Sequence, residues 1–561
     1  MAFVSRAVHA PSWLSPTRVY TPIVSRRTWL LSRHMSTPAS LPARLQEADS
    51  PVQLLSDGTM RIVQLNREKA LNAIDENMID LIHEAFDEIE PSPNAATVLF
   101  RGKGRAMCAG GDIRSIVEAA AKTDMKERIA SARFFQGEIM QNYRVHTMRK
   151  NTTQLGHPKT YIGLWDGIVM GGGVGMTVHG PIRVATDRTL WAMPETAIGY
   201  FPDVGLLYTF SRLDGGVGAY LALTGQRLSG ADTYLIGLAT HYVRSSLVEE
   251  MLRRLSTMPM TSAVHEEAIL EAIEEFTSDP FEDDPSLLPT SMFLRDRRIA
   301  MDITFSRKSV EQILLALDDL AQRRDDTPVV KELWARGAQL TAEVVEWAAE
   351  TAGILRERSP RALKVTLRGL QRSRDQTLAE NMHMNMRLST AFCDLSIGRD
   401  FYTGVNHVLG KDPNTGKRRT GMPPWDPARL EDVTDEYMDT FFFGDYRKAC
   451  EAGLQLELLK LENVPHTGKS REARKARDAE VRGVGPLGWH PQHNPNALPS
   501  EAELAALYEG SHPAAGSYVL EPAELLDVIT RHKHHKPGVR TKVQDWLDRR
   551  SRAVAAGATS L

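Results

Sequence analysis

Alternating and helical hydrophobic patterns predict an α/β fold over the first half of the chain. Residues 60–65 alternate apolar and polar side chains as in a half-buried strand, whereas residues 77–89 place apolar side chains at helical spacing. Short apolar runs at 97–100 and 161–165 indicate buried strands, and each is followed by a glycine turn. This recurrence of strand, glycine turn and helix favours the α/β class.

The second half of the chain is predicted to be mainly helical, from about residue 231 to residue 408. Apolar side chains recur at helical spacing over residues 309–317 and 362–370, and the second stretch follows a Ser-Pro pair that suits a helix start. Near the C-terminus, Ser500 and Glu503 form the capping-box pattern of another short helix. We therefore expect an α/β core joined to a helical C-terminal region.

Length and composition divide the chain into four expected parts. At 561 residues it exceeds one compact core. The first 46 residues contain no Asp or Glu but carry six Arg among Ser, Thr and apolar residues, which is typical of a mitochondrial transit peptide. A disordered basic tail is the alternative. We expect the transit peptide at 1–35, the core at 50–250, the helical region at 251–443, an extension of unknown role at 444–561, and a location in the mitochondrial matrix.

Bulk composition argues against several classes of protein. Hydrophobic residues make up 42% and charged residues 25%, and the formal net charge of −3 gives no field that demands a nucleic acid partner. The three cysteines include no CxxC pair, so neither a disulfide framework nor a zinc site is expected. The chain beyond the first segment holds no run of apolar residues long enough to span a bilayer, so membrane insertion is not expected.

Two glycine-rich segments follow predicted strands. The first is residues 106–113 (AMCAGGDI), and the second is residues 170–175 (MGGGVG), which also opens a predicted helix. Glycine lets a ligand approach the main chain closely, and N–H groups at the start of a helix favour developing negative charge. Two such N–H groups that face one oxygen make an oxyanion hole. A tight turn or close helix packing is the alternative explanation for each segment alone.

A third segment places two carboxylates in an apolar loop. Residues 191–205 (WAMPETAIGYFPDVG) hold Glu195 and Asp203, each preceded by a proline that restricts the loop backbone. A carboxylate buried among Trp, Met, Ile and Phe has a raised pKa, which suits acid/base chemistry near neutral pH. A surface pair of carboxylates or a helix N-cap is the alternative.

The order and spacing of these three segments resemble the crotonase superfamily, and the run from residue 170 to residue 205 resembles its 3-hydroxyisobutyryl-CoA hydrolase branch. The resemblance covers residues 52–443 and includes LNREKALNA at 65–73, LTG at 223–225 and RDFYTGV at 399–405. It implies a spiral of ββα units with a helical C-terminal region. It also implies hydrolysis of the thioester of 3-hydroxyisobutyryl-CoA, or of a related short hydroxyacyl-CoA, in valine catabolism.

The resemblance further implies roles for individual residues. It assigns the oxyanion N–H groups to Gly111 and Gly172, a substrate-contacting acid to Glu138, and the catalytic carboxylates to Glu195 and Asp203. The expected partner is therefore a small acyl-CoA, in which coenzyme A is part of the substrate. No metal or other cofactor is implied, because thioester cleavage needs only carbonyl polarisation, a nucleophile and proton transfer. The oligomeric state is left open.

Residue 175 bears on the choice between hydrolysis and hydration. Enoyl-CoA hydratases of this superfamily carry a second catalytic glutamate three residues after the oxyanion glycine, and this chain has Gly175 there. Asp203 occupies a loop position where hydratases typically carry a small residue. Thioester hydrolysis is therefore favoured. Glu195 would either activate water or attack the carbonyl to give a mixed anhydride, while Asp203 orients the 3-hydroxyl group or water.

A structural role in the mitochondrial ribosome is the main alternative function. Fungal mitochondrial small ribosomal subunits contain a protein that resembles the same hydrolase branch. A basic cluster at residues 471–477 and a basic, histidine-rich run at 531–536 suit contact with rRNA phosphates. Interleaved acids lower that field, so a solvated helical face is the simpler interpretation. The histidines of the second run lack both HxxxH spacing and a carboxylate partner, so no metal site is expected there.

Overall fold

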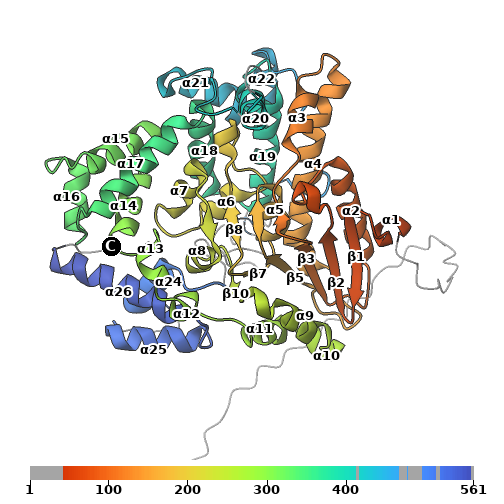
Figure 1. The fold of residues 1–561 in the computed structure, drawn as a ribbon, viewed down its shortest axis with the longest axis horizontal. Coiled ribbons are helices and arrows are strands. Elements are labelled where there is room, and N and C mark those ends of the chain that lie inside the picture. Colours follow the sequence, from red (N-terminus) through yellow and green to blue (C-terminus); the bar gives the residue numbers. More distant parts are fainter. Residues whose placement is uncertain are drawn as a thin grey trace, which may run out of the picture. The chain divides into compact units, whose positions relative to one another are not determined.

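The computed structural model describes residues 42–411, 416, 417, 419–466, 475, 477, 496–512 and 519–557. The predicted transit peptide at residues 1–35 lies outside this part of the chain. Strands and helices are interleaved from residue 52 to residue 242, and helices dominate the rest of what is described (Figure 1). Among the described residues, no helix combines the length and apolar character needed to cross a membrane.

A six-stranded sheet forms one part of the α/β core. The strand order is β1-β2-β3-β5-β7-β10, in which β1 and β2 are antiparallel and all other neighbours are parallel. β2, β3 and β5 confirm the three strands predicted from the hydrophobic pattern. The strands are β1 (Val52–Asp57), β2 (Met60–Leu65), β3 (Thr97–Gly102), β5 (Thr160–Trp165), β7 (Ile182–Ala185) and β10 (His241–Tyr242).

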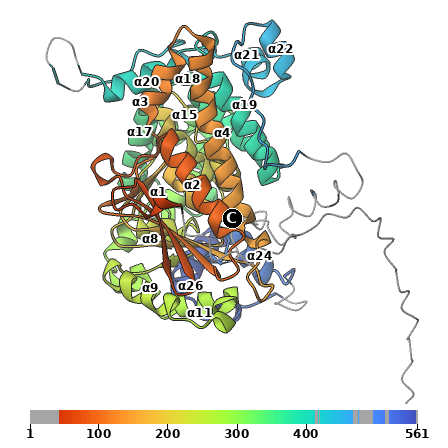
Figure 2. The same ribbon diagram turned by 90° about the vertical axis from the view of Figure 1, so that its right-hand side faces the viewer.

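Apolar side chains are buried on both faces of this sheet. Successive side chains of a strand point to opposite faces, so neighbouring residues belong to different apolar clusters. Ile62 and Leu99 belong to an apolar cluster with α9 and α11, which lie below the sheet in both views (Figures 1 and 2). Val63 and Phe100 belong to the larger cluster that includes α2 and α5. These helices are α2 (Glu76–Ile89), α5 (Gly172–Val178), α9 (Val248–Ser256) and α11 (Glu266–Glu274).

From β3 to β8, successive strands alternate between the first sheet and a second sheet. β3, β5 and β7 lie in the first sheet, and the strand that follows each of them along the chain lies in the second, whose order is β4-β6-β8-β9. β4, β6 and β8 are parallel, whereas β9 is antiparallel to β8. This arrangement confirms the predicted crotonase-type α/β fold. The strands are β4 (Ala106–Cys108), β6 (Ile168–Met170), β8 (Leu190–Ala192) and β9 (Leu228–Ser229).

The helical region follows the strands and packs on the core. α18 begins after the N-cap Ser359 with Pro360 at its first position, and α15 begins after the N-cap Ser309, which confirms both predicted helices. α19 packs along the core helix α4 (Figures 1 and 2). The longer helices are α4 (Met125–Thr147), α14 (Arg295–Phe305), α15 (Val310–Ala321), α17 (Ala342–Glu357), α18 (Pro360–Ser373), α19 (Leu378–Cys393) and α20 (Asp400–Leu409). The shorter ones are α1 (Ala43–Gln46), α3 (Ile113–Ala120), α6 (Leu206–Phe210), α7 (Val217–Thr224), α8 (Gly230–Leu235), α10 (Met260–Ala263), α12 (Pro280–Asp283), α13 (Leu287–Thr290), α16 (Pro328–Ala335) and α21 (Asp435–Met438).

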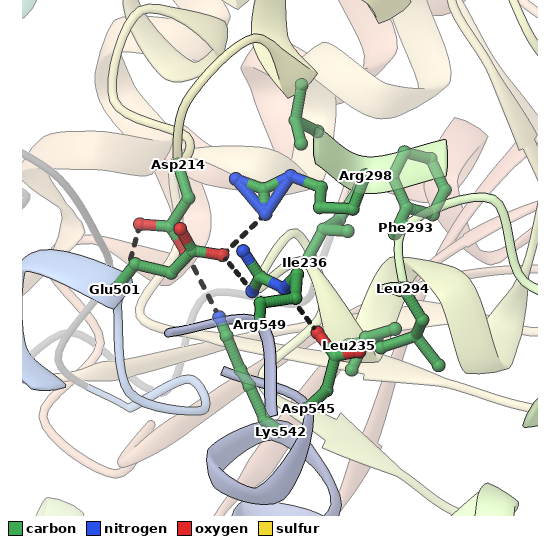
Figure 3. Close-up of a pocket in the computed structure, with 11 residues that line it drawn as sticks. Asp214, Leu235, Ile236, Phe293, Leu294, Arg298, Glu501, Lys542, Asp545 and Arg549 are labelled. Carbon is green, nitrogen blue, oxygen red and sulfur yellow. Dashed lines mark hydrogen bonds and ion pairs between the residues drawn. The ribbon is translucent and has the colours of Figure 1, made fainter. Parts of the chain in front are cut away.

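Two of the described C-terminal helices, α24 and α26, dock on the core through buried ion pairs (Figure 3). Glu501 lies 2.5 Å from Arg298 and 2.7 Å from Arg549, and Lys542 lies 3.2 Å from Asp214. The cavity among these side chains measures only about 20 Å³, and the predicted site residues do not line it. We therefore interpret this region as a docking interface. The C-terminal helices are α22 (Tyr446–Glu451), α24 (Glu501–Tyr508), α25 (Pro522–His532) and α26 (Val539–Ala555).

The capping box predicted at α24 forms only in part. The Ser500 hydroxyl accepts a hydrogen bond from the Glu503 N–H at 3.0 Å. The Glu503 carboxylate does not return to the Ser500 N–H and instead lies 3.1 Å from Lys533 Nζ. A charged partner from a neighbouring helix has replaced the local hydrogen bond, which the sequence pattern does not reveal.

Candidate active site

The three predicted chemical segments meet because they follow three neighbouring strands. β4, β6 and β8 are parallel, so their carboxyl ends lie at the same edge of the second sheet. The two glycine turns are side by side at this edge. An ideal Cβ built on Gly171 would lie 3.3 Å from the Cα of Gly110, and one built on Gly172 would lie 3.6 Å from the nitrogen of Gly111. The fold thus brings both turns to one point.

The N–H groups of Gly111 and Gly172 are available to a ligand. Gly172 is the first residue of α5, so its N–H has no acceptor within the helix. No described residue accepts a hydrogen bond from either N–H. The preceding glycines, Gly110 and Gly171, have φ angles of +106° and +48°, which favour glycine at both turns. Two adjacent, unpaired N–H groups have the chemistry of an oxyanion hole.

Glu138 reaches the same point from helix α4. Its side chain is only 2% exposed, and Oε1 would lie 2.0 Å from an ideal Cβ on Gly172. No described residue donates a hydrogen bond to Oε1. A side chain larger than hydrogen at residue 172 would therefore displace the carboxyl. Glycine at residue 172 thus allows the close approach of Glu138.

The two carboxyls of the third segment, Glu195 and Asp203, lie near the other site residues and have different neighbours. Glu195 begins the short 3-10 helix η3 (Glu195–Ile198), and its Oε1 would lie 3.2 Å from an ideal Cβ on Gly171. No described residue donates to its Oε2. The Asp203 Oδ2 lies 3.4 Å from the Tyr200 hydroxyl, which is 2.7 Å from Ser389 Oγ. Tyr200 is a site residue that sequence reasoning missed, because a lone tyrosine in a loop carries no local signal.

The three carboxyls share one buried cluster, and this changes their protonation. Burial raises the pKa of Asp203 to about 7. Burial and the nearby Asp203 charge hold the pKa of Glu195 well above its usual range. Burial, followed by the charges of Asp203 and Glu195, does the same for Glu138. Since like charges this close disfavour one another, the cluster keeps at least one proton near neutral pH. It can therefore supply both an acid and a base.

Gly175 has no room for the second glutamate of a hydratase. An ideal Cβ there would lie 2.5 Å from the Val204 Cβ and 3.0 Å from the Asn142 Oδ1. Real Cβ atoms do not approach other atoms as closely as the first distance. A side chain attached to residue 175 would therefore clash with the Asp203 loop and contact α4. The missing carboxylate is a property of the packing as well as of the sequence.

Three described cations of the two basic segments form ion pairs within the chain. Arg477 lies 2.7 Å from Glu380, Arg531 lies 2.6 Å from Asp527, and Lys536 pairs with Glu274. Arg471 and Arg474 lie outside the described residues. These ion pairs lower the positive charge that the described part of the two basic segments presents, so this part does not favour an rRNA surface.

One histidine of the basic run has a carboxylate neighbour after all. Glu503, His512 and His532 each bring one ligand atom to within 4.8 Å of the others. This corrects the expectation that the run lacks a carboxylate partner. Glu503 belongs to α24, so the local sequence around His532 does not reveal it. Lys533 Nζ already lies 3.1 Å from Glu503 and competes for that carboxylate.

Comparison with known proteins identifies the class to which this fold and site belong. The family model described as enoyl-CoA hydratase/isomerase matches residues 60–442. A carnitinyl-CoA dehydratase from Mycobacterium thermoresistibile has a similar structure, with a TM-score of 0.54 and 30% identity, covering 73% of this chain and 99% of that chain. An enoyl-CoA hydratase from Rhodobacter sphaeroides 2.4.1 shares the fold, with a TM-score of 0.52 and 23% identity over 71% of this chain and 99% of that one. The chain belongs to the enoyl-CoA hydratase/isomerase family.

Within this family, the chain is similar to 3-hydroxyisobutyryl-CoA hydrolases. It is 33% identical over 423 residues to 3-hydroxyisobutyryl-CoA hydrolase 1 of Arabidopsis thaliana, which covers 75% of this chain and 97% of that protein. It is 36% identical over 398 residues to the mitochondrial 3-hydroxyisobutyryl-CoA hydrolase of Homo sapiens, which covers 71% of this chain and 89% of that protein. These matches confirm the resemblance to the hydrolase branch and give no support to the ribosomal alternative.

Proposed function

We propose that this chain hydrolyses the thioester of 3-hydroxyisobutyryl-CoA, or of a related short hydroxyacyl-CoA, to the free acid and CoA. The observation that carries the proposal is a pair of N–H groups, on Gly111 and Gly172, for which no described residue is the acceptor, with the buried Glu195 carboxyl beside them. The names of the Arabidopsis and human relatives supply the acyl group. The clash that a side chain at residue 175 would make argues against hydration by a pair of glutamates.

In the proposed reaction, the thioester carbonyl oxygen accepts hydrogen bonds from the N–H groups of Gly111 and Gly172. These bonds strengthen as negative charge develops on the oxygen, and losing one such donor typically costs about 2.7–4 kcal/mol of transition-state stabilisation. Glu195 either takes a proton from the attacking water or attacks the carbonyl carbon itself to form a mixed anhydride. The carbon–sulfur bond then breaks, and the CoA sulfur takes a proton from a protonated carboxyl of the cluster. On the second route, a water molecule then hydrolyses the anhydride, which releases the acid and regenerates the Glu195 carboxylate.

Glu138 and Asp203 have supporting roles in this proposal. Glu138 contacts the substrate beside Gly172, and its raised pKa suits a carboxyl that carries a proton near neutral pH. Asp203 orients the hydroxyl group of the acyl chain or the attacking water, and its pKa of about 7 lets it exchange a proton at physiological pH. The reaction calls for no metal or redox cofactor.

Release of free CoA thiol tests the proposal directly. Purified protein is expected to release thiol from 3-hydroxyisobutyryl-CoA, and Glu195→Gln is expected to lower kcat by roughly 10²–10⁴-fold because it removes the proton acceptor or nucleophile. Glu431→Gln changes an exposed carboxylate and should leave kcat unchanged. The proposal is refuted if the wild type releases no thiol from any short hydroxyacyl-CoA, or if Glu195→Gln retains the full rate.

A single turnover in ¹⁸O-labelled water addresses the two routes. Direct attack by water puts the label into the acid product. If a mixed anhydride forms and water opens it at the glutamate carbonyl, the label enters Glu195 and the first acid product is unlabelled. Label in the peptide that contains Glu195 therefore rules out direct attack.

We also propose that the protein acts in the mitochondrial matrix. The acid-free, Arg-rich composition of residues 1–46 supports this location, as does the word mitochondrial in the name of the human relative. A reporter protein fused to residues 1–46 should be imported into mitochondria and resist added protease. A reporter that stays in the cytosol would contradict this part of the proposal.

A further inference from the structure

Helix α4 lies over α5 in a register that pairs polar side chains of α4 with glycines of α5. Glu138 and Asn142 stand one helical turn apart, on the same side of α4. The Glu138 carboxyl approaches Gly172, and Oδ1 of Asn142 would lie 3.0 Å from an ideal Cβ on Gly175. Asn142 therefore occupies the wall of the site at which residue 175 would project a side chain.

The Asn142 amide is buried with its hydrogen-bonding capacity largely unused. The residue has no exposed surface, and among the described residues its Nδ2 reaches only the Met176 sulfur, a weak acceptor, at 3.7 Å. No described residue donates to its Oδ1. The neighbours around the Gly175 position include the Val204 side chain, which carries no donor. Since buried amide oxygens are normally paired, this one is available to a donor that enters with a ligand.

We propose that Asn142 determines specificity by accepting, at Oδ1, a hydrogen bond from a hydroxyl group on the third carbon of the acyl chain. This inference rests on the proposed function, because the thioester carbonyl at Gly172 sets the register of the substrate. Gly172 and Gly175 are three residues apart in α5, a rise of about 4.5 Å. The hydroxyl oxygen lies three single bonds beyond the carbonyl carbon, which is a comparable reach. Asp203 is then left to orient the attacking water.

Two CoA esters that differ by one hydroxyl group test this inference without turnover. In the Glu195→Gln protein, calorimetry gives the Kd of 3-hydroxyisobutyryl-CoA and of isobutyryl-CoA, with and without Asn142→Leu. Leucine has a similar size and no acceptor. We expect Asn142→Leu to weaken binding of the hydroxy ester about ten-fold and to leave isobutyryl-CoA binding unchanged or tighter. Asn406→Leu, at an exposed position of α20, is the matched control and should change neither Kd.

The outcomes separate a contact to the hydroxyl group from a structural role. Equal weakening of both esters overturns the inference, and so does an unchanged preference for the hydroxy ester. If the leucine variant does not fold, Asn142→Ala removes the same acceptor with a smaller side chain and is held to the same result. Thiol release, measured with protein that keeps Glu195, tests the proposed hydrolysis independently. If this protein releases no thiol but its preference for the hydroxy ester still depends on Asn142, the proposed hydrolysis is refuted and the inference about the hydroxyl contact stands.

Discussion

Replacing Asp203 by Asn is expected to stabilise the protein, and increasingly so as the pH rises. Asp203 is 4% exposed, and burial raises its pKa from the ordinary 3.8 to about 7. Between these pH values the unfolded chain has released this proton while the folded protein keeps it, so the wild type loses stability as the pH increases. Since one pKa unit corresponds to about 1.4 kcal/mol, the loss reaches roughly 4 kcal/mol above pH 7. Asparagine has the same shape and nothing to ionise.

Urea unfolding at pH 5, 6, 7 and 8 measures this difference. The fluorescence of Trp165 and Trp191, both fully buried, reports unfolding. Relative to the wild type, Asp203→Asn should gain about 2 kcal/mol between pH 5 and pH 7 and little above pH 7. The variant also lacks the negative charge that raises the pKa of Glu138 and Glu195, and this effect has the same sign. The variant should lose most of its proposed activity while it gains stability.

Asp57→Asn controls for the loss of one negative charge, because Asp57 is exposed at the end of β1. Its stability should follow the wild-type pH dependence. Parallel curves for Asp203→Asn and the wild type, or a less stable variant at pH 8, would refute the reasoning. Asp203 would then not lie in a desolvated cluster, and its proposed exchange of a proton near neutral pH would lose its physical basis.

Two further changes test the oxyanion turn and the C-terminal docking interface. Gly172→Ala places a Cβ 2.0 Å from the Glu138 Oε1. We therefore expect the thiol-release assay to show a fall in kcat of at least about 10²-fold, with an unchanged circular dichroism spectrum. A variant that keeps its rate would exclude this turn from the site. Glu501→Gln leaves the buried Arg298 and Arg549 without their shared carboxylate, so urea unfolding should show a loss of roughly 3–5 kcal/mol. An unchanged midpoint would mean that this interface contributes little.

Hydrophobic spacing predicted the longer regular elements because their burial repeats along the chain. The expected strand at 60–65 is β2, and the expected helix at 77–89 is α2 with one more residue at its start. Hydrophobic spacing did not predict β4 and β6. Each has three residues, which is too short for a period to be read, and their pairing joins segments that are distant in sequence.

Local patterns were also unable to supply the partners of the site residues. Tyr200 is near Asp203 in sequence, but its contact with Ser389 depends on α19 packing beside the loop. Asn142 approaches Gly175 only because α4 packs against α5. The half-formed capping box at Ser500 has the same origin, since a lysine from another helix takes the glutamate that the local pattern assigns to the N-cap.

By itself, the sequence determined which chemical groups are present and their order along the chain: glycines at two turns, then carboxylates in an apolar, proline-punctuated loop. Only the tertiary structure decided that the N–H groups of Gly111 and Gly172 lie together, and that Glu138, Glu195 and Asp203 share one buried cluster. The physical reason is that burial and neighbouring charge set a carboxyl pKa, and both depend on packing between segments that no local pattern connects.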